Sequence, residues 1–180
     1  MGAYYVKNED ELHDLLKTLI PEGQTVSFGG TMTLFETNTM DWLRAQNYNL
    51  LDRYAEGLTP ADIKQLYRNA FSADTYITST NAVTEDGQLY NVDGRGNRVA
   101  AMIYGPDQVV VVTGTNKIVR DHDEAIQRNR RVAAPANVKR LSRKTPCHTL
   151  GYCTDCDSPD RVCNAFVTIS KQAEKDRIKV

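Results

Sequence analysis

The chain has 180 residues, of which 41% are hydrophobic and 25% charged, and its formal net charge is −1 at pH 7. This length and composition are those of one globular domain with a substantial core. A nearly neutral chain argues against a broad nucleic-acid surface, and no apolar run approaches the roughly 20 residues of a membrane span. The first residues lack the apolar segment of a secretory signal, so we expect a cytoplasmic protein with no membrane or nucleic-acid partner.

Strand-like and helix-like segments alternate along the first 145 residues. Asn8 precedes an amphipathic stripe as a cap-forming residue, and Thr59 followed by Pro60 marks another helix start. We predict helices at 8–20, from 29 to about 46, and at 59–71, 95–105 and 121–134. We predict strands at 3–7, 24–28, 74–80 and 109–114, and a final hairpin or pair of edge strands at 165–172 and 176–180.

This alternation predicts an α/β fold with a mainly parallel sheet covered by helices. The run at 109–114 begins apolar on both faces, as expected of a central strand. We expect one domain with an α/β core at 1–145, a cysteine-rich segment at 146–164 and terminal strands at 165–180. Ligands of such sheets bind at the carboxyl ends of the strands, so the loops that follow the strands are the candidate site.

The loop after the strand at 24–28 has the residues of an anion site. Gly29 and Gly30 let the backbone approach a ligand closely. Thr31 and Thr33 place hydroxyls and amides at a helix start, where anions bind. The alternative is a tight turn in which Thr31 only caps the helix.

The segment after the strand at 74–80 is rich in hydrogen-bonding groups, including Thr80 and Asn81. Glu85 and Asp86 follow on a turn, and we interpret Asp86 as part of a solvated hairpin tip. Glu85 is either solvated as well or folded inward, where a desolvated carboxylate would be a candidate nucleophile or base. We expect the turn at 84–87 to reach the same crevice as the glycine-rich loop at 93–98.

Two further loops carry groups that suit an anion. The loop at 93–98 frees the backbone with two glycines and ends in an arginine that either binds an anion or lies on the helix surface. Its spacing is not a dinucleotide fingerprint, because the third glycine is missing. The loop after the central strand adds a lysine and an amide, and no Ser/His/Asp triad is evident. The residues of these two loops are Asp93, Gly94, Gly96, Asn97, Arg98, Asn116 and Lys117.

All four cysteines lie within one short stretch, Cys147, Cys153, Cys156 and Cys163, with spacings x5, x2 and x6. Such clustering points to a local device in a reducing compartment rather than a disulfide framework. Four thiolates suit zinc or an iron–sulfur cluster, although no familiar ferredoxin spacing matches. The alternatives are reduced structural thiols or adventitious disulfides, and His148 is a weaker candidate ligand.

Four stretches, in this order, resemble the LUD domain, the lactate-utilisation family that includes LutC and the YkgG-like proteins. They are SFGGTMTLFE, ITSTNAVTEDGQLYNVDGRGNRVAAMIYGP, VVVVTGTNKIV and AAPANVKRL. The resemblance covers nearly the whole chain, and the cysteine segment looks like the short, stand-alone branch of the family. LutC itself is not characterised by such a tail. Members usually carry a helical segment before the strand at YYVKN, so the resemblance predicts a shortened start.

The resemblance implies a fold like that of NagB, ribose-5-phosphate isomerase and CoA transferases, whose ligands are phosphosugars or acyl-CoA. It implies that the four loops described above form one ligand site. LutC-like members are linked to oxidation of L-lactate to pyruvate alongside iron–sulfur partner proteins. What the domain itself does in that process does not transfer with the resemblance.

Four functions fit these features. We rank first an accessory protein of lactate or organic-acid utilisation that binds a small phosphate, carboxylate or CoA-type anion and forms a homodimer. The second is an enzyme with Glu85 as nucleophile or base and with Arg98 and Lys117 holding the anion. The third is a metal or redox module at the cysteines, and the fourth a structural partner-binding domain. Accessory binding ranks first because likeness of fold alone does not establish an activity.

Overall fold

The structure is a computed structural model that describes residues 1–180. The chain divides into two compact units, each described here by itself. Unit 1 comprises Met1–Ser79, Ala100–Thr113 and Gln172–Val180, and unit 2 comprises Thr80–Val99 and Gly114–Lys171. None of the helices has both the length and the apolar character needed to cross a lipid bilayer.

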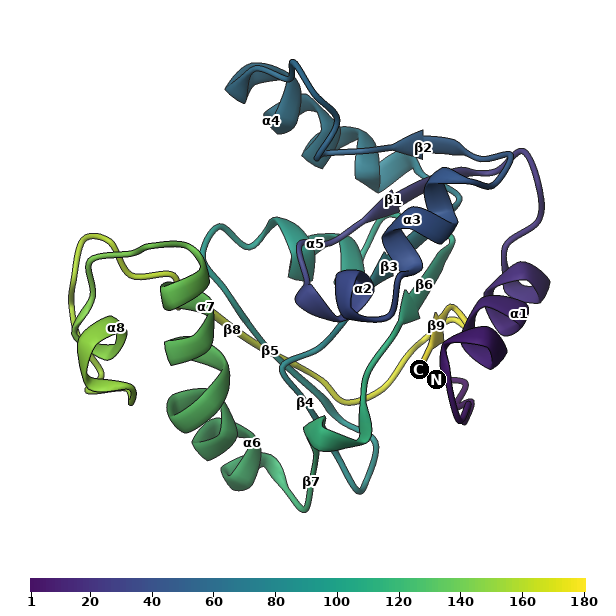
Figure 1. The fold of residues 1–180 in the computed structure, drawn as a ribbon. Coiled ribbons are helices and arrows are strands. Elements are labelled where there is room, and N and C mark those ends of the chain that lie inside the picture. Colours follow the sequence, from purple (N-terminus) through teal and green to yellow (C-terminus); the bar gives the residue numbers. More distant parts are fainter. The chain divides into compact units, whose positions relative to one another are not determined.

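Unit 1 is built on a five-stranded parallel sheet with the strand order β2-β1-β3-β6-β9 (Figure 1). The side chains of β3 are all buried, and those of β6 are buried at three of four positions, which confirms the predicted central strand. The strands are β1 (Thr25–Phe28), β2 (Asn49–Leu51), β3 (Thr75–Thr78), β6 (Gln108–Val111) and β9 (Ile178–Lys179).

Three helices of unit 1 pack on the sheet through one apolar cluster. Leu16, Leu34 and Leu43, one from each helix, are fully buried against Val26 and Ile77 of the strands. The caps that the sequence predicted are present, because the Asn8 side chain accepts from the Glu11 amide and Thr59 forms a capping box. The helices are α1 (Glu9–Leu19), α2 (Met32–Glu36), α3 (Thr39–Arg44), α4 (Pro60–Asn69) and the 3-10 turn η1 (Ala70–Ser72).

Unit 2 is built on a second sheet, which the sequence did not predict. Its strand order is β7-β4-β5-β8, with β4–β5 and β5–β8 antiparallel and β4–β7 parallel. The strands are short, so the sequence of the polar stretch at 82–93 does not indicate the hairpin between β4 and β5. The strands are β4 (Ala82–Thr84), β5 (Leu89–Asp93), β7 (Ile118–Val119) and β8 (Ala165–Ile169).

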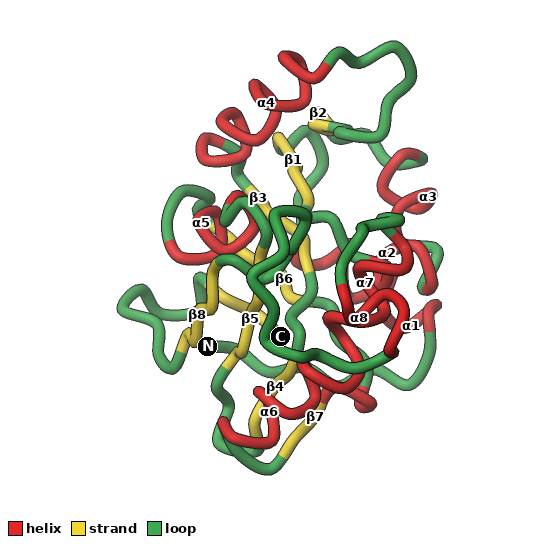
Figure 2. The backbone as a smooth tube through the Cα atoms, turned by 90° about the vertical axis from the view of Figure 1, so that its left-hand side faces the viewer, coloured by secondary structure: helices red, strands yellow, loops and turns green.

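One long helical run covers this second sheet, and Figure 2 shows its first part beside β4 and β7. Ala125 and Ile126 pack against Tyr90 and Val119 of the strands. The run is longer than the predicted helix at 121–134 and includes a turn of π-helix. It consists of α6 (His122–Arg128), the π-helix η3 (Asn129–Ala133) and α7 (Ala134–Arg140). The remaining elements are α8 (Pro146–Leu150), the 3-10 turn η2 (Thr115–Lys117) and α5 (Asn97–Ile103), which runs from unit 2 into unit 1.

Two predicted elements are corrected by the structure, and one open alternative is decided. Residues 3–7 form no strand, because only Gly2 makes a bridge, to Lys179. The helix predicted from 29 to about 46 is two helices, broken where Asn38 adopts a left-handed conformation with φ 50. Of the two alternatives for the last two strands, the pair of edge strands is confirmed, since β8 pairs with β5 and β9 with β6, each at the end of its sheet.

Candidate functional site

The glycine loop after β1 lies where the strand order of the first sheet changes direction. From β1 the chain proceeds to β2 on one side, whereas β3 lies on the other side of β1 and leads to β6. Ligands of open α/β sheets bind at such a switch point. Gly29 is fixed there by its amide, which donates to the Ile77 carbonyl at 2.9 Å. The Thr31 hydroxyl accepts from the Thr33 amide at 3.2 Å and so caps α2.

An arginine that the sequence did not single out lies against this loop. Arg53 follows β2, and a Cβ on Gly30 would lie 3.1 Å from its Nη1 atom. The guanidinium lies 4.7 Å from the ring centre of Tyr67 and 5.2 Å from that of Tyr54. Arg53 is half-buried, and these ring contacts are its interactions in the structure. The neighbouring carboxylate of Asp52 is already engaged with Arg44 at 2.9 Å.

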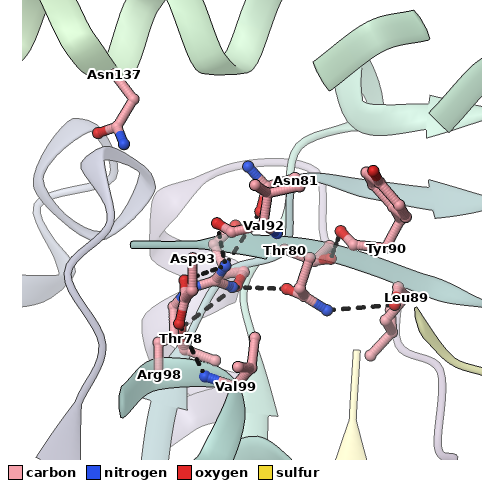
Figure 3. Close-up of polar contacts among 12 residues, drawn as sticks. Thr78, Thr80, Asn81, Leu89, Tyr90, Val92, Asp93, Arg98, Val99 and Asn137 are labelled. Atoms are coloured by element: carbon pink, nitrogen blue, oxygen red, sulfur yellow. Dashed lines mark hydrogen bonds and ion pairs between the residues drawn. The ribbon is translucent and has the colours of Figure 1, made fainter. Parts of the chain in front are cut away.

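Arg98, predicted as an anion ligand, is the centre of a buried polar network in unit 2 (Figure 3). Its Nε donates to Asp93 Oδ1 at 2.9 Å, its Nη1 to Asn91 Oδ1 at 2.6 Å and its Nη2 to Asn81 Oδ1 at 3.1 Å. Asp93 Oδ2 accepts from the Val99 amide in the first turn of α5. Arg98 and Asp93 are 8% and 9% exposed, so this ion pair joins β4, β5 and α5 from the inside.

Arg128 connects the second and fourth predicted loops, a role that no sequence pattern indicates. Its Nη1 donates to the Asn81 carbonyl at 2.5 Å and its Nε to the Asn116 carbonyl at 3.1 Å. Burial lowers the pKa of Arg128. The structure therefore brings Asn81 and Asn116 together through one half-buried guanidinium, with Lys117 directly after Asn116 in η2.

Glu85 lies apart from this network. It is exposed at the turn between β4 and β5, and its amide donates to the Val119 carbonyl at 2.9 Å. Because Ala82 pairs with Tyr90 in the hairpin, the turn lies at the end opposite to Asp93. The prediction that the turn at 84–87 reaches the loop at 93–98 is therefore wrong, and the burial that would support a nucleophile or base is not found at Glu85.

The turn itself has the character expected of a solvated tip. Asp86 is exposed and accepts hydrogen bonds from the Thr84 hydroxyl and from the Gln88 side chain. These two bonds, in that order of size, lower the pKa of Asp86.

The remaining predicted site residues of unit 2 have roles in the structure of the backbone. The Thr80 hydroxyl donates to the carbonyls of Ala82 and Tyr90 at 3.0 and 2.9 Å. A Cβ on Gly94 would lie 3.4 Å from the Val162 carbonyl oxygen, so the loop passes closely over the cysteine segment. Gly96 has φ +78, which favours glycine, and Asn97 begins α5.

The four cysteines are free thiols, with Cys147 buried and the other three half-buried. No group of three or more His, Cys, Asp or Glu side chains is placed to hold a metal ion. Cys147 is engaged with the Thr145 hydroxyl at 3.3 Å, whereas Cys153 and Cys163 line a cavity of unit 2 that does not include Cys156. The predicted four-cysteine site for zinc or an iron–sulfur cluster is thus not assembled in this structure.

Comparison with known protein families gives a match to the LUD domain over residues 1–180. The chain belongs to the LUD domain family. Membership of this family implies a role related to lactate utilisation. Comparison with functionally curated proteins gives no match for this LUD domain.

Solved structures similar to this LUD domain include two kinds of protein. The tetrameric eIF2B-beta2-delta2 complex from C. thermophilum matches with 17% identity and a TM-score of 0.43, over 64% of this chain and 43% of that one. Ribose 5-phosphate isomerase from Plasmodium falciparum matches with 10% identity and a TM-score of 0.36, over 62% and 52%. Ribose 5 phosphate isomerase A from Neisseria gonorrhoeae matches with 14% identity and a TM-score of 0.35, over 64% and 56%. The LUD domain spans about half the length of these chains.

Proposed function

We propose that this LUD domain protein is an accessory protein of lactate or related organic-acid utilisation that binds a small anion at Arg53 and the Gly29–Thr31 loop. The family membership supports the first part of the proposal. The stacking of Arg53 on two tyrosine rings, with no carboxylate or carbonyl bound to its guanidinium, supports the second and is the observation on which it depends. The partners that we propose for it are iron–sulfur proteins of lactate oxidation and a second copy of the chain.

The chemistry of Arg53 suits a carboxylate or phosphate. A planar guanidinium offers two parallel N–H donors to an anion, and cation–π stacking fixes its plane. The Arg53 Cζ atom lies over the rings of Tyr54 and Tyr67, and no carboxylate or carbonyl is bound to its N–H groups, which leaves them for hydrogen bonding to a ligand. Gly30 adds no side chain at the point of closest approach, so an anion can reach the guanidinium and the loop amides together.

The proposal is tested by Arg53→Gln, which removes the charge and keeps a side chain able to hydrogen-bond. We expect its affinity for the anions that bind the unaltered protein to fall by about 10- to 100-fold, as for loss of a hydrogen bond to a charged group. The measurement is calorimetric titration with inorganic phosphate, L-lactate, pyruvate and acetyl-CoA. Arg68→Gln, on the exposed surface of α4, is the matched control and should leave affinity unchanged.

The calorimetric titration tests the anion site at Arg53 independently of the role that the family membership supports. Equal affinities of Arg53→Gln and the unaltered protein would rule out the anion site at Arg53. Absence of binding by the unaltered protein for all four compounds would contradict a small-anion ligand of these classes.

A further inference from the structure

A cavity of about 450 Å³ lies wholly within unit 2, between the helical run and the cysteine segment. Its size is that of a small-molecule site. Tyr90, Ile126 and Phe166 supply apolar wall, and Cys153 and Cys163 contribute two free thiols. Phe166 is 56% exposed, so the cavity opens to solvent on that side. Neither the family membership nor the anion site at Arg53 accounts for this cavity.

Two hydrogen-bonding atoms in the lining have no partner in the protein. Asn129 is 4% exposed, and its buried Oδ1 accepts no hydrogen bond. The Nε of Arg161 is buried and likewise unpaired. A buried polar atom left unpaired is destabilising and rare, so each one calls for an explanation. Asn129 also begins the π-helix, and such turns occur frequently at functional sites.

Two guanidinium groups make the cavity suitable for a negative ligand. Arg161 is fixed by donating to the carbonyls of Cys156 at 2.6 Å and Cys163 at 2.9 Å. Arg161 and Cys163 both line the cavity and are joined by the bond to the Cys163 carbonyl, and the Cys163 side chain raises the pKa of Arg161. Arg130 has only a loose ion pair at 3.7 Å with the exposed Asp155. A carboxylate that enters the cavity meets both cations.

We propose that this cavity admits a small disulfide bearing carboxylates and that Cys163 exchanges with it to form a mixed disulfide. The volume of about 450 Å³ corresponds to about 15 water molecules, which matches a short peptide thiol better than a three-carbon acid. The carboxylates bind the guanidinium groups of Arg130 and Arg161, which both line the cavity. Cys163 is the reacting thiol because it is bonded through its carbonyl to the cationic Arg161, whereas Cys153 contacts Asp155, an acidic residue of the lining, through the Asp155 amide at 3.3 Å.

The exchange needs no reagent besides the disulfide. The Cys163 sulfur attacks one sulfur of the ligand, the sulfur–sulfur bond of the ligand breaks, and a new one forms to Cys163. The other half of the ligand leaves as a thiolate and takes up the proton that Cys163 has lost. Cys163 is thereby oxidised and the departing half is reduced, so electrons and atoms balance.

The test is incubation of the reduced chain with oxidised glutathione, followed by intact-mass measurement and peptide mapping. We expect one glutathione per chain, attached to Cys163, and no adduct in Cys163→Ser. Cys147→Ser and Cys156→Ser are controls and should react as the unaltered chain does. No adduct, an adduct at another cysteine alone, or equal labelling of all four would overturn the proposal.

The role of charge is tested by comparing oxidised glutathione with the neutral 2-hydroxyethyl disulfide. Arg130→Gln should slow the reaction with oxidised glutathione by about three- to tenfold, the size of one nearby charge interaction, and leave the neutral reagent unaffected. Arg131→Gln, an exposed neighbour on the same π-helix, should change neither rate. Equal slowing for both reagents, or no slowing at all, would contradict carboxylate binding by Arg130.

Discussion

Replacing Arg98 by methionine is expected to lower the free energy of unfolding by about 3–5 kcal/mol, the cost of removing one partner of a buried ion pair. Methionine fills a similar volume, but it leaves the Asp93 carboxylate charged and uncompensated inside unit 2. The oxygens of Asn81 and Asn91 lose a charged donor at the same time. Equilibrium unfolding in urea, followed by circular dichroism, measures the change.

Two further variants distinguish the ion pair from a general effect of substitution. Arg95→Met alters an exposed arginine of the same loop and should cost less than about 0.5 kcal/mol. Adding Asp93→Asn to Arg98→Met removes the stranded charge while keeping an acceptor for the Val99 amide, and it should restore part of the lost stability. A loss for Arg98→Met no larger than that for Arg95→Met would show that the network is not structural.

Arg177→Met should be the second most damaging change, with a loss of about 3 kcal/mol in the free energy of unfolding. Arg177 is 7% exposed and donates to backbone carbonyls at the end of α5 and beyond. The bonds run from Nε to Pro106 at 2.8 Å, from Nη1 to Met102 at 2.9 Å and from Nη2 to Ala101 at 3.3 Å. Methionine leaves these buried carbonyls without a donor, because the last carbonyls of a helix have no partner within it.

Urea unfolding again measures the effect, with Lys175→Met as the exposed control in the same segment. Arg177→Lys should lie between the two, because an ammonium keeps the charge but cannot reach several carbonyls at once. Burial lowers the pKa of Arg177, which agrees with a cation held by carbonyls rather than by a carboxylate. Equal stability of Arg177→Met and Lys175→Met would refute this capping role.

The first half of the fold was predictable because its signals are local. Asn8 and Thr59 cap their helices within three residues of each start, and the apolar run of β6 is typical of a central strand. The second sheet was not predictable, since β4 and β5 are short and lie among turn residues. Its register also depends on β8, which follows β5 by more than seventy residues.

The candidate site was predictable only in part, because its residues come from parts of the chain that are far apart in the sequence. Gly29 and Gly30 are recognisable beside a strand, but Arg53 reaches them from the end of β2. Arg98 was found as an important residue and assigned as a ligand, whereas its bonds to Asn81 and Asp93 make it part of the framework. No pattern within the loop distinguishes a guanidinium that binds a ligand from one that binds its own chain.

The cysteines show what spacing alone can and cannot indicate. The clustering of four thiols led to the prediction of a metal or cluster site, but the expected four-thiolate geometry is not formed in this structure. Cys153 and Cys163 instead line a cavity whose other polar residues include Asn129 and Arg130 of the π-helix and Arg161. His122 is exposed, lines this cavity as well, and has its Nε2 2.9 Å from Thr168 Oγ1. The residues that line this cavity come from segments that are distant in the sequence, so they come together only when the chain folds.

The most direct measurement for the anion site is the side-chain N–H spectrum of the arginines, recorded by nuclear magnetic resonance during titration with L-lactate and with phosphate. The account predicts that the Arg53 Nε–H signal moves in proportion to site occupancy, because this guanidinium has no partner of its own in the structure. The Arg98 signal should stay in place, since its Nε–H is already bound to Asp93. A moving Arg98 signal with an unchanged Arg53 signal would contradict the account and would indicate that the anion binds at the loop at 93–98.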